Sequence, residues 1–268
     1  LIKPISRGAF GRVLLSRHTT TRAIYAAKVL EKKDMALRNQ MANVRREQNI
    51  MAYAENKSVV QLHYAFQSRS YVFLLMEYQP GGDLETVLEN VGCIASKWAL
   101  HYLGEMTLAI EFIHGLGIIH RDIKPANWLI TRTGNLKLAD FGLSREGVTE
   151  RRRKKMPISG APLDAASATP APEAWDMTGF LGLQELVGPI AAKRSFRRHA
   201  SRQFEAVGTP GYAAPELLQE SGYSFEVDWW SLGITAFEMI AGLPPFLGSN
   251  FEQILAATLS GEIDFTLF

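Results

Sequence analysis

Residues 120–127 read His-Arg-Asp-Ile-Lys-Pro-Ala-Asn, between a predicted helix and a predicted strand. This stretch places a carboxylate at Asp122, a cation at Lys124 and an amide at Asn127. A second stretch, Asp-Phe-Gly, begins at Asp140 and adds a carboxylate on a turn that ends in glycine. Carboxylate and amide oxygens are ligands that Mg²⁺ accepts. The two stretches together indicate a metal-dependent site rather than an ordinary polar loop.

Three features nearer the N-terminus fit a phosphate-bearing ligand. Residues 6–13 read Ser-Arg-Gly-Ala-Phe-Gly-Arg-Val, and their glycines let backbone amides approach an anion, although a tight hairpin is the other interpretation. Lys28 lies on a predicted strand, where it could also be an edge lysine whose charge reaches solvent. Glu47 lies on the apolar stripe of a predicted helix. A carboxylate there requires a partner, and Lys28 is the natural one.

The hydrophobic pattern divides the chain into a strand-rich part and a helical part. We predict an α+β molecule with a β-rich N-terminal lobe over residues 1–78 and a helical C-terminal lobe over residues 79–268. The helix over residues 227–241 is apolar nearly all round and should be buried. Strands are predicted at residues 13–15, 24–30, 71–76, 128–130 and 136–138, and helices at residues 37–53, 98–116 and 227–241.

The composition, with 47% hydrophobic and 21% charged residues, is that of a soluble globular chain. The net charge is only +2, and the positive charge is local, because residues 146–205 hold 10 Lys and Arg against 7 Asp and Glu. We therefore expect no nucleic-acid partner. Cys93 is the only cysteine, which favours a reducing compartment, cytoplasmic or nuclear. Charges and prolines interrupt the longest apolar stretch, so no membrane span is predicted.

Residues 147–204 are predicted to be a largely disordered insertion, because they are rich in Ala, Pro and Ser and carry basic clusters at both ends. Three interpretations of this insertion stay open. It could be a solvated spacer, a segment regulated by phosphorylation or a partner, or a nuclear import signal in the basic run at residues 151–155. Ser201 follows Arg198 by three residues and is a candidate phosphorylation site.

The complete motif set resembles a eukaryotic protein kinase catalytic domain. It comprises the glycine-rich loop, the strand lysine, the helix glutamate, the His-Arg-Asp loop, Asp-Phe-Gly and the Ala-Pro-Glu that ends at Glu216. The resemblance covers nearly all of the chain except the insertion. Residues 76–83, 207–216 and 228–233 are similar to the AGC group of kinases. Within that group the chain looks most like the Greatwall/MAST branch and its fungal nutrient-signalling relatives, with the NDR/LATS kinases as the second choice.

The resemblance implies ATP and Mg²⁺ as cofactors and a protein Ser/Thr hydroxyl as acceptor. Asp122 would orient that hydroxyl and take its proton, and Lys124 would neutralise the γ-phosphate. Asn127 and Asp140 would bind Mg²⁺. Thr209 would bridge to Asp122 and Lys124, which fits Ser/Thr specificity, and is itself a candidate phosphorylation site. The residues implied to cover, line or hold the nucleotide are Ser6, Gly8, Ala9, Phe10, Gly11, Val13, Ala26, Lys28, Glu47, Met76, Glu77, Gln79, Asp83 and Leu129.

Some residues depart from the kinase pattern. Trp128 stands where a mid-sized aliphatic residue is usual, and overpacking typically costs about 1–3 kcal/mol. Ala126 stands where an acidic residue is usual. The C-terminal lobe is expected to be truncated, so that Glu216 would be buried without its usual arginine partner.

These observations leave two hypotheses. The first is an active, monomeric Ser/Thr protein kinase in cell-cycle or nutrient signalling, whose substrates would include endosulfine-like phosphatase inhibitors. The second is a pseudokinase-like module that binds nucleotide or partners without useful turnover. The presence of every polar residue of the motif set favours the kinase.

Overall fold

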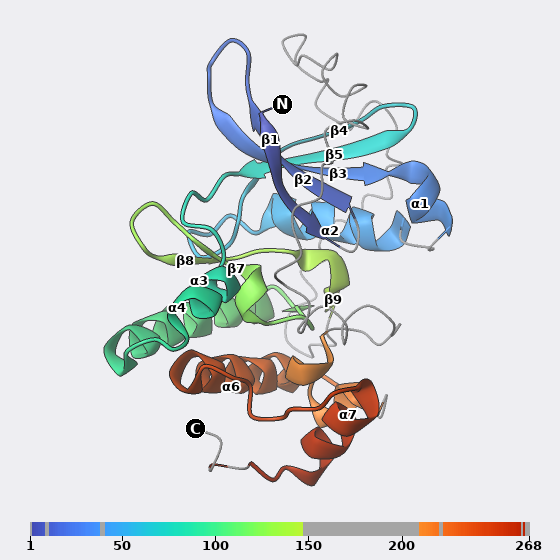
Figure 1. Ribbon diagram of the computed structural model, residues 1–268. Helices are drawn as coiled ribbons and strands as arrows, with labels where there is room; N and C mark the ends of the chain where they lie inside the picture. Colours follow the sequence, from blue (N-terminus) through green and yellow to red (C-terminus); the bar gives the residue numbers. More distant parts are fainter. Residues whose placement is uncertain are drawn as a thin grey trace. The chain divides into compact units, whose positions relative to one another are not determined.

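The computed structural model describes residues 2–8, 11–37, 41–146, 209–219, 222–263 and 265 (Figure 1). The described chain forms two compact units. One holds the residues up to Glu55 together with Val60–Tyr78, and the other holds Asn56–Val59 and the described residues from Gln79 onward. Three predictions lie outside the described residues, namely the insertion at residues 147–204, the nucleotide contacts of Ala9 and Phe10, and the phosphorylation site at Ser201.

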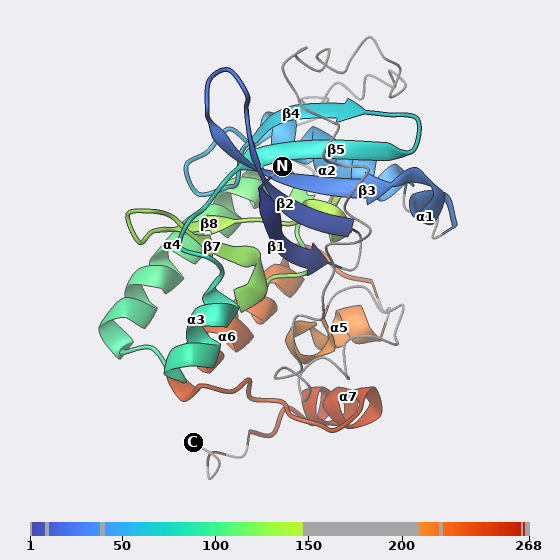
Figure 2. The ribbon, with the colours of Figure 1, turned by 45° about the horizontal axis from the view of Figure 1, so that its top comes forward.

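The first unit is built on a five-stranded antiparallel sheet of order β1-β2-β3-β5-β4 (Figure 2). Its strands are β1 (Lys3–Gly8), β2 (Gly11–Arg17), β3 (Ile24–Glu31), β4 (Leu62–Gln67) and β5 (Tyr71–Glu77), and its helices are α1 (Lys32–Leu37) and α2 (Met41–Tyr53). The single helix predicted over residues 37–53 was placed too early, because α2 begins at Met41 and a separate helix, α1, ends at Leu37.

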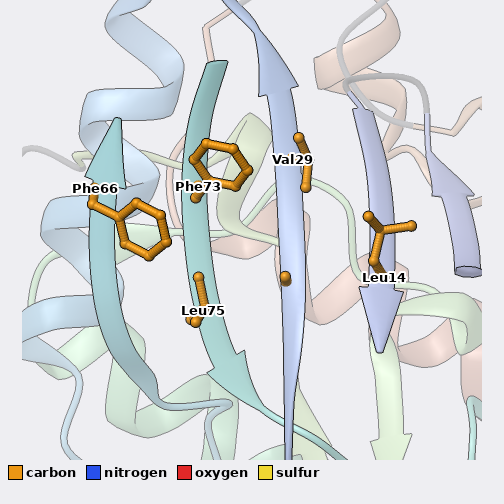
Figure 3. Close-up of a cluster of buried hydrophobic side chains, with 6 residues drawn as sticks. Leu14, Val29, Phe66, Phe73 and Leu75 are labelled. Carbon is orange, nitrogen blue, oxygen red and sulfur yellow. The ribbon is translucent and has the colours of Figure 1, made fainter. Parts of the chain in front are cut away.

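The register of the sheet sorts side chains onto two faces. Leu14 lies opposite Ala27, and Val29 lies opposite Phe73, so these side chains share one face. With Phe66 and Leu75 they form a cluster in which every residue is at most 8% exposed (Figure 3). The other face carries four residues of the predicted nucleotide site, Val13, Ala26, Lys28 and Met76.

The second unit is mainly helical, which together with the sheet of the first unit confirms the predicted α+β class. The two short strands predicted at residues 128–130 and 136–138 have the predicted bounds and pair with each other as β7 and β8. Its elements are α3 (Leu84–Val91), α4 (Ser96–Gly115), β6 (Ile118–Ile119), β7 (Trp128–Ile130), β8 (Leu136–Leu138), β9 (Arg145–Glu146), α5 (Pro215–Leu218), α6 (Glu226–Ala241) and α7 (Phe251–Ser260).

Helix α6 packs against α4, and eight of its 16 residues are buried (Figure 1). Trp229 and Ile240 are 39% and 55% exposed, so the prediction of a helix buried on all sides is only partly right. Its buried residues include Asp228, which is fully enclosed. Sequence analysis did not find α7, which begins after Asn250, where the Asn250 side chain accepts a hydrogen bond from the backbone of Gln253. No helix among the described residues is both long enough and apolar enough to cross a membrane.

Gly11 permits a close approach between β2 and β3. A Cβ atom at this position would overlap the carbonyl oxygen of Val29 and lie 2.9 Å from Cδ2 of Leu30. We expect Gly11→Ala to lower the free energy of unfolding by about 1–3 kcal/mol, because the backbone of β3 must shift. Urea unfolding would measure this change.

The matched control for Gly11→Ala is Gly104→Ala. Gly104 lies inside α4, and apart from its chain neighbours and the nearby backbone of that helix, no atom of the described residues lies within 4 Å of an added Cβ. Alanine should therefore raise the stability by about 0.5–1 kcal/mol through helix propensity. Equal effects of the two substitutions would contradict the close approach at Gly11.

Candidate active site

In the first unit, Lys28 and Glu47 form a buried ion pair. The distance from Lys28 Nζ to Glu47 Oε1 is 2.6 Å, and the two side chains are only 10% and 2% exposed. Lys28 comes from β3 and Glu47 from α2. The pairing was predicted because Glu47 lies on the apolar stripe of its helix, and the structure contains it. The ion pair holds the ammonium group of Lys28 in one position.

In the second unit, four polar side chains of the predicted site meet. Lys124 Nζ lies 2.8 Å from Asp122 Oδ2 and donates to Thr209 Oγ1 at 2.6 Å. The Thr209 hydroxyl in turn donates to Asp122 Oδ1 at 2.9 Å, which is the bridge that the sequence predicts. Asn127 Nδ2 donates to Asp122 at both its carbonyl oxygen, at 2.7 Å, and Oδ2, at 3.1 Å. These bonds fix the orientation of the Asp122 side chain, and the residue is only 9% exposed.

Helix α6 anchors the loop that carries Asp122 through hydrogen bonds from Asp228. Asp228 accepts the backbone N–H groups of His120 and Arg121, each at 2.8 Å, and lies 2.8 Å from His114 Nε2 of α4. Arg121 is in the left-handed region with φ 67°, as is Asp140 with φ 64°. Such conformations cost about 1–3 kcal/mol each and persist where surrounding bonds impose them. The bonds from Asp228 supply that constraint at Arg121.

Sequence analysis missed the role of Asp228. The sequence did contain a signal for it. Asp228, like Glu47, is a carboxylate inside an apolar helix, where it requires a partner. Its partners could not be named, because two of them are backbone N–H groups.

His120 connects this loop to the Asp-Phe-Gly turn. Its Nε2 lies 3.2 Å from the carbonyl oxygen of Ala139, which can only accept, so the ring donates from Nε2. The ring also meets Phe141 edge-on, with centroids 5.0 Å apart. Burial lowers the pKa of His120, although the carboxylates of Asp228, Asp122 and Asp140 oppose this effect. A neutral imidazole therefore fixes the residue that precedes Asp140.

The buried imidazole makes stability depend on pH. Because the folded pKa of His120 lies below its unfolded value of about 6.5, the unfolded state takes up a proton first as pH falls. The contribution of His120 to stability is thus present above pH about 6.5 and is lost as the pH falls below that value. We expect His120→Phe to unfold with a weaker pH dependence than the wild type between pH about 7.5 and 5. Identical slopes of unfolding free energy against pH would refute this assignment.

The sequence model of the protein kinase domain matches residues 1–161 and 193–265. The chain belongs to the protein kinase family. It is 38% identical over 266 residues to the probable serine/threonine protein kinase IRE4 of Arabidopsis thaliana, covering 98% of this chain and 23% of that protein. It is 41% identical over 255 residues to the human serine/threonine-protein kinase LATS1, covering 93% and 22%.

A third relative is the serine/threonine-protein kinase ppk18 of Schizosaccharomyces pombe. It is 36% identical over 323 residues, covering 98% of this chain and 24% of that protein. The chain therefore spans about a quarter or less of the length of these relatives. LATS kinases belong to the AGC group, so the predicted AGC membership of this kinase domain is confirmed.

The remaining predicted nucleotide contacts of the kinase domain lie on several elements. Ser6 and Gly8 are in β1, and Glu77, at the end of β5, accepts the backbone N–H of Gln61 at 2.9 Å. Gln79 follows at the start of the second unit. Asp83 caps α3 by accepting the N–H of Thr86 at 2.7 Å and forms a backbone bridge with Leu129 of β7.

The structure tests the expectations for two residues, Glu216 and Trp128, that the sequence analysis singled out as unlike a complete kinase domain. Glu216 is only half-buried and is not without a partner, so the prediction of a buried, unpaired carboxylate is wrong. Trp128 is fully buried in β7, opposite Leu138. Its indole N–H has no hydrogen-bond partner among the described residues. Burial without a partner costs about 1–3 kcal/mol, so the tryptophan is accommodated at the expense of an unsatisfied donor.

The predicted metal ligands, Asn127 and Asp140, carry the oxygen atoms that a hard cation prefers. Asn127 Nδ2 is held by Asp122, so the atom that Asn127 can offer to a metal is Oδ1. Asp140 adds carboxylate oxygens, and oxygen ligands suit Mg²⁺. The described residues contain no cluster of three or more His, Cys, Asp or Glu that could hold an ion alone.

Proposed function

We propose that this chain is the catalytic domain of a serine/threonine protein kinase that transfers the γ-phosphate of ATP to protein hydroxyls. The observation that carries the proposal is the cluster of Asp122, Lys124 and Thr209, joined by contacts of 2.6–2.9 Å beside the amide of Asn127. A family match alone does not test whether the catalytic groups are assembled. The geometry of this cluster supports the view that they are.

Each group of the cluster has a chemical task in phosphate transfer. The acceptor hydroxyl oxygen forms a bond to the γ-phosphorus, the bond from that phosphorus to the β–γ bridging oxygen breaks, and ADP leaves. Asp122 accepts the hydroxyl proton, while Lys124 offsets negative charge on the transferred group. Mg²⁺ bound by Asn127 and Asp140 would neutralise phosphate oxygens. In the first unit, Lys28 would contact the nucleotide phosphates from its position beside Glu47.

The Ser/Thr acceptor class has support from the structure and from the relatives, whereas the particular substrate is a prediction from the sequence. The Thr209 bridge and the names of the relatives support Ser/Thr rather than Tyr acceptors. A Greatwall/MAST-like branch, an endosulfine-like phosphatase inhibitor as substrate, a role in cell-cycle or nutrient signalling, a monomeric state and a cytoplasmic or nuclear location are predictions from the sequence. We carry them forward as proposals.

Transfer of labelled γ-phosphate from ATP to a mixture of basic Ser/Thr peptides tests the proposed function. We expect label on serine and threonine in the presence of Mg²⁺, no label with EDTA, and loss of transfer in Asp140→Asn. Label on tyrosine would contradict the acceptor class. Undiminished transfer by Asp140→Asn would contradict the metal site.

A second candidate function is nucleotide binding without useful turnover. The observation that favours it is Trp128, whose buried, unsatisfied indole directly follows the metal ligand Asn127. This alternative predicts that the wild-type chain binds nucleotide but transfers no phosphate.

A further inference from the structure

Helix α4 of the second unit carries an apolar stripe on its exposed side. Leu100 and Leu108 are 67% and 60% exposed, and Gly104 lies exposed midway between them. The opposite side of the helix, which packs within the unit, carries the buried residues Ala99, Met106, Ala109, Ile110 and Ile113. The two exposed leucines therefore contribute little to the packing of this unit.

The two ends of the stripe carry opposite charges. Lys97 lies seven residues before Gly104, Glu111 lies seven residues after it, and both are exposed. At about 100° per residue, these positions and the two leucines fall within a strip of the helix surface about 80° wide. Among the described residues, neither Lys97 nor Glu111 forms an ion pair or a side-chain hydrogen bond. Helix α4 therefore presents a cation, a leucine, a glycine, a leucine and an anion along one line.

This order is complementary to itself in an antiparallel pair of helices. If two copies of α4 cross at Gly104 and run in opposite directions, Leu100 of one copy lies at the level of Leu108 of the other. Lys97 then lies at the level of Glu111 of the second copy. A parallel pair would bring like charges together at both ends of the stripe, which is repulsive. The charges therefore favour the antiparallel orientation.

Gly104 allows the two helix backbones to approach closely. Outside α4 itself, no atom of the described residues lies within 4 Å of a Cβ added at this position, so the space above Gly104 is open. The distance between two packed helices depends on the size of the side chains at their crossing, and glycine adds none. The leucines on either side of it can therefore pack against those of the second copy.

We propose that this face of α4 is an interface between two copies of the chain, related by a twofold axis beside Gly104. Each contact then occurs twice, giving two pairs of leucines and two ion pairs between Lys97 and Glu111. An interface formed by one helix is small, so the association is weak and the chain is monomeric when dilute. The monomeric state predicted from the sequence and this dimer are states of one chain at different concentrations. The interface does not depend on phosphate transfer.

Sedimentation velocity of the 268-residue chain from about 1 μM to about 300 μM tests the interface. We expect the weight-average sedimentation coefficient to rise toward that of a dimer with increasing concentration. Lys97→Glu or Glu111→Lys alone places like charges opposite each other, so each should raise the Kd of the dimer at least about tenfold. The double variant Lys97→Glu/Glu111→Lys has opposite charges again and should dimerise like the wild type.

Two further variants separate the interface from general effects on the chain. Gly104→Gln should weaken the dimer by holding the backbones apart, whereas its higher helix propensity should raise the melting temperature. Lys33→Glu is the same charge reversal at an exposed position of α1 and should leave the association unchanged. Circular dichroism verifies that each variant is folded.

Three results would overturn the proposal. The first is a wild-type chain that stays monomeric up to about 300 μM. The second is self-association that Lys97→Glu and Glu111→Lys leave unchanged, which would place the contact elsewhere. The third is a folded double variant that is as monomeric as the two single variants, because the ion pairs would then not be those of the antiparallel pair.

Discussion

Asp122→Asn is expected to lower kcat for phosphate transfer by about 10²–10⁴-fold, the range typical of losing a general base. The amide is nearly isosteric with the carboxylate but cannot accept the acceptor hydroxyl's proton. Its oxygen can still accept a bond from Lys124 or Thr209, so the loop should keep its shape. Steady-state transfer to a Ser/Thr peptide, with kcat and KM for ATP determined separately, measures the effect.

The control for Asp122→Asn is Asp34→Asn, the same chemical change at an exposed position in the first turn of α1. We expect wild-type kinetics from this control. If Asp122→Asn kept the kcat of the wild type, the carboxylate at the centre of the cluster would not be the base, and the proposed mechanism would fail.

The largest loss of stability is expected from Asp228→Ala. Removing the carboxylate leaves the buried N–H groups of His120 and Arg121 without their acceptor, and it removes the partner of His114. Breaking such a buried charged network typically costs about 3–5 kcal/mol. Urea unfolding, followed by tryptophan fluorescence and by circular dichroism, measures the loss.

Glu226→Ala provides the comparison for Asp228→Ala. Glu226 is an exposed acid in the first turn of the same helix, and its replacement should change stability by no more than about 0.5 kcal/mol. Asp228→Asn should lie between the two, because its amide keeps one acceptor oxygen. A loss from Asp228→Ala as small as that from Glu226→Ala would contradict the anchoring role of α6.

Lys28 and Asp228 show how far sequence reasoning reaches into this site. Glu47 could be matched with Lys28 because a carboxylate on an apolar stripe needs a cation, and one unexplained lysine was available on a nearby strand. Asp228 posed the same problem in α6, but two of its partners are backbone N–H groups, which every residue except proline carries. The sequence pattern alone could not identify the backbone N–H groups of His120 and Arg121 as the partners of Asp228.

The secondary structure was predicted best where side-chain pattern decides it. Strands β7 and β8 were placed with the right bounds because three apolar or alternating residues stand between turn signals on each side. Helix α7 was missed, although Asn250 followed by Gln253 is a capping signal that could have indicated its start.

The sequence pattern near each residue could not predict contacts between residues that are far apart in the sequence. Arg121 and Arg145 both donate to the hydroxyl oxygen of Tyr223, and these bonds join residues 102 and 78 positions apart. They depend on how β9 and the loop before α6 are brought together, and no periodicity in the sequence reports that arrangement.

The most direct test of the central claim measures nucleotide binding and phosphate transfer on the same preparations of wild-type chain and Asp122→Asn. We expect both proteins to bind Mg·ATP, and we expect the wild type to transfer the γ-phosphate to a Ser/Thr peptide about 10²–10⁴-fold faster than Asp122→Asn. If both proteins bind Mg·ATP and neither transfers phosphate, the chain is a nucleotide-binding module and not a kinase.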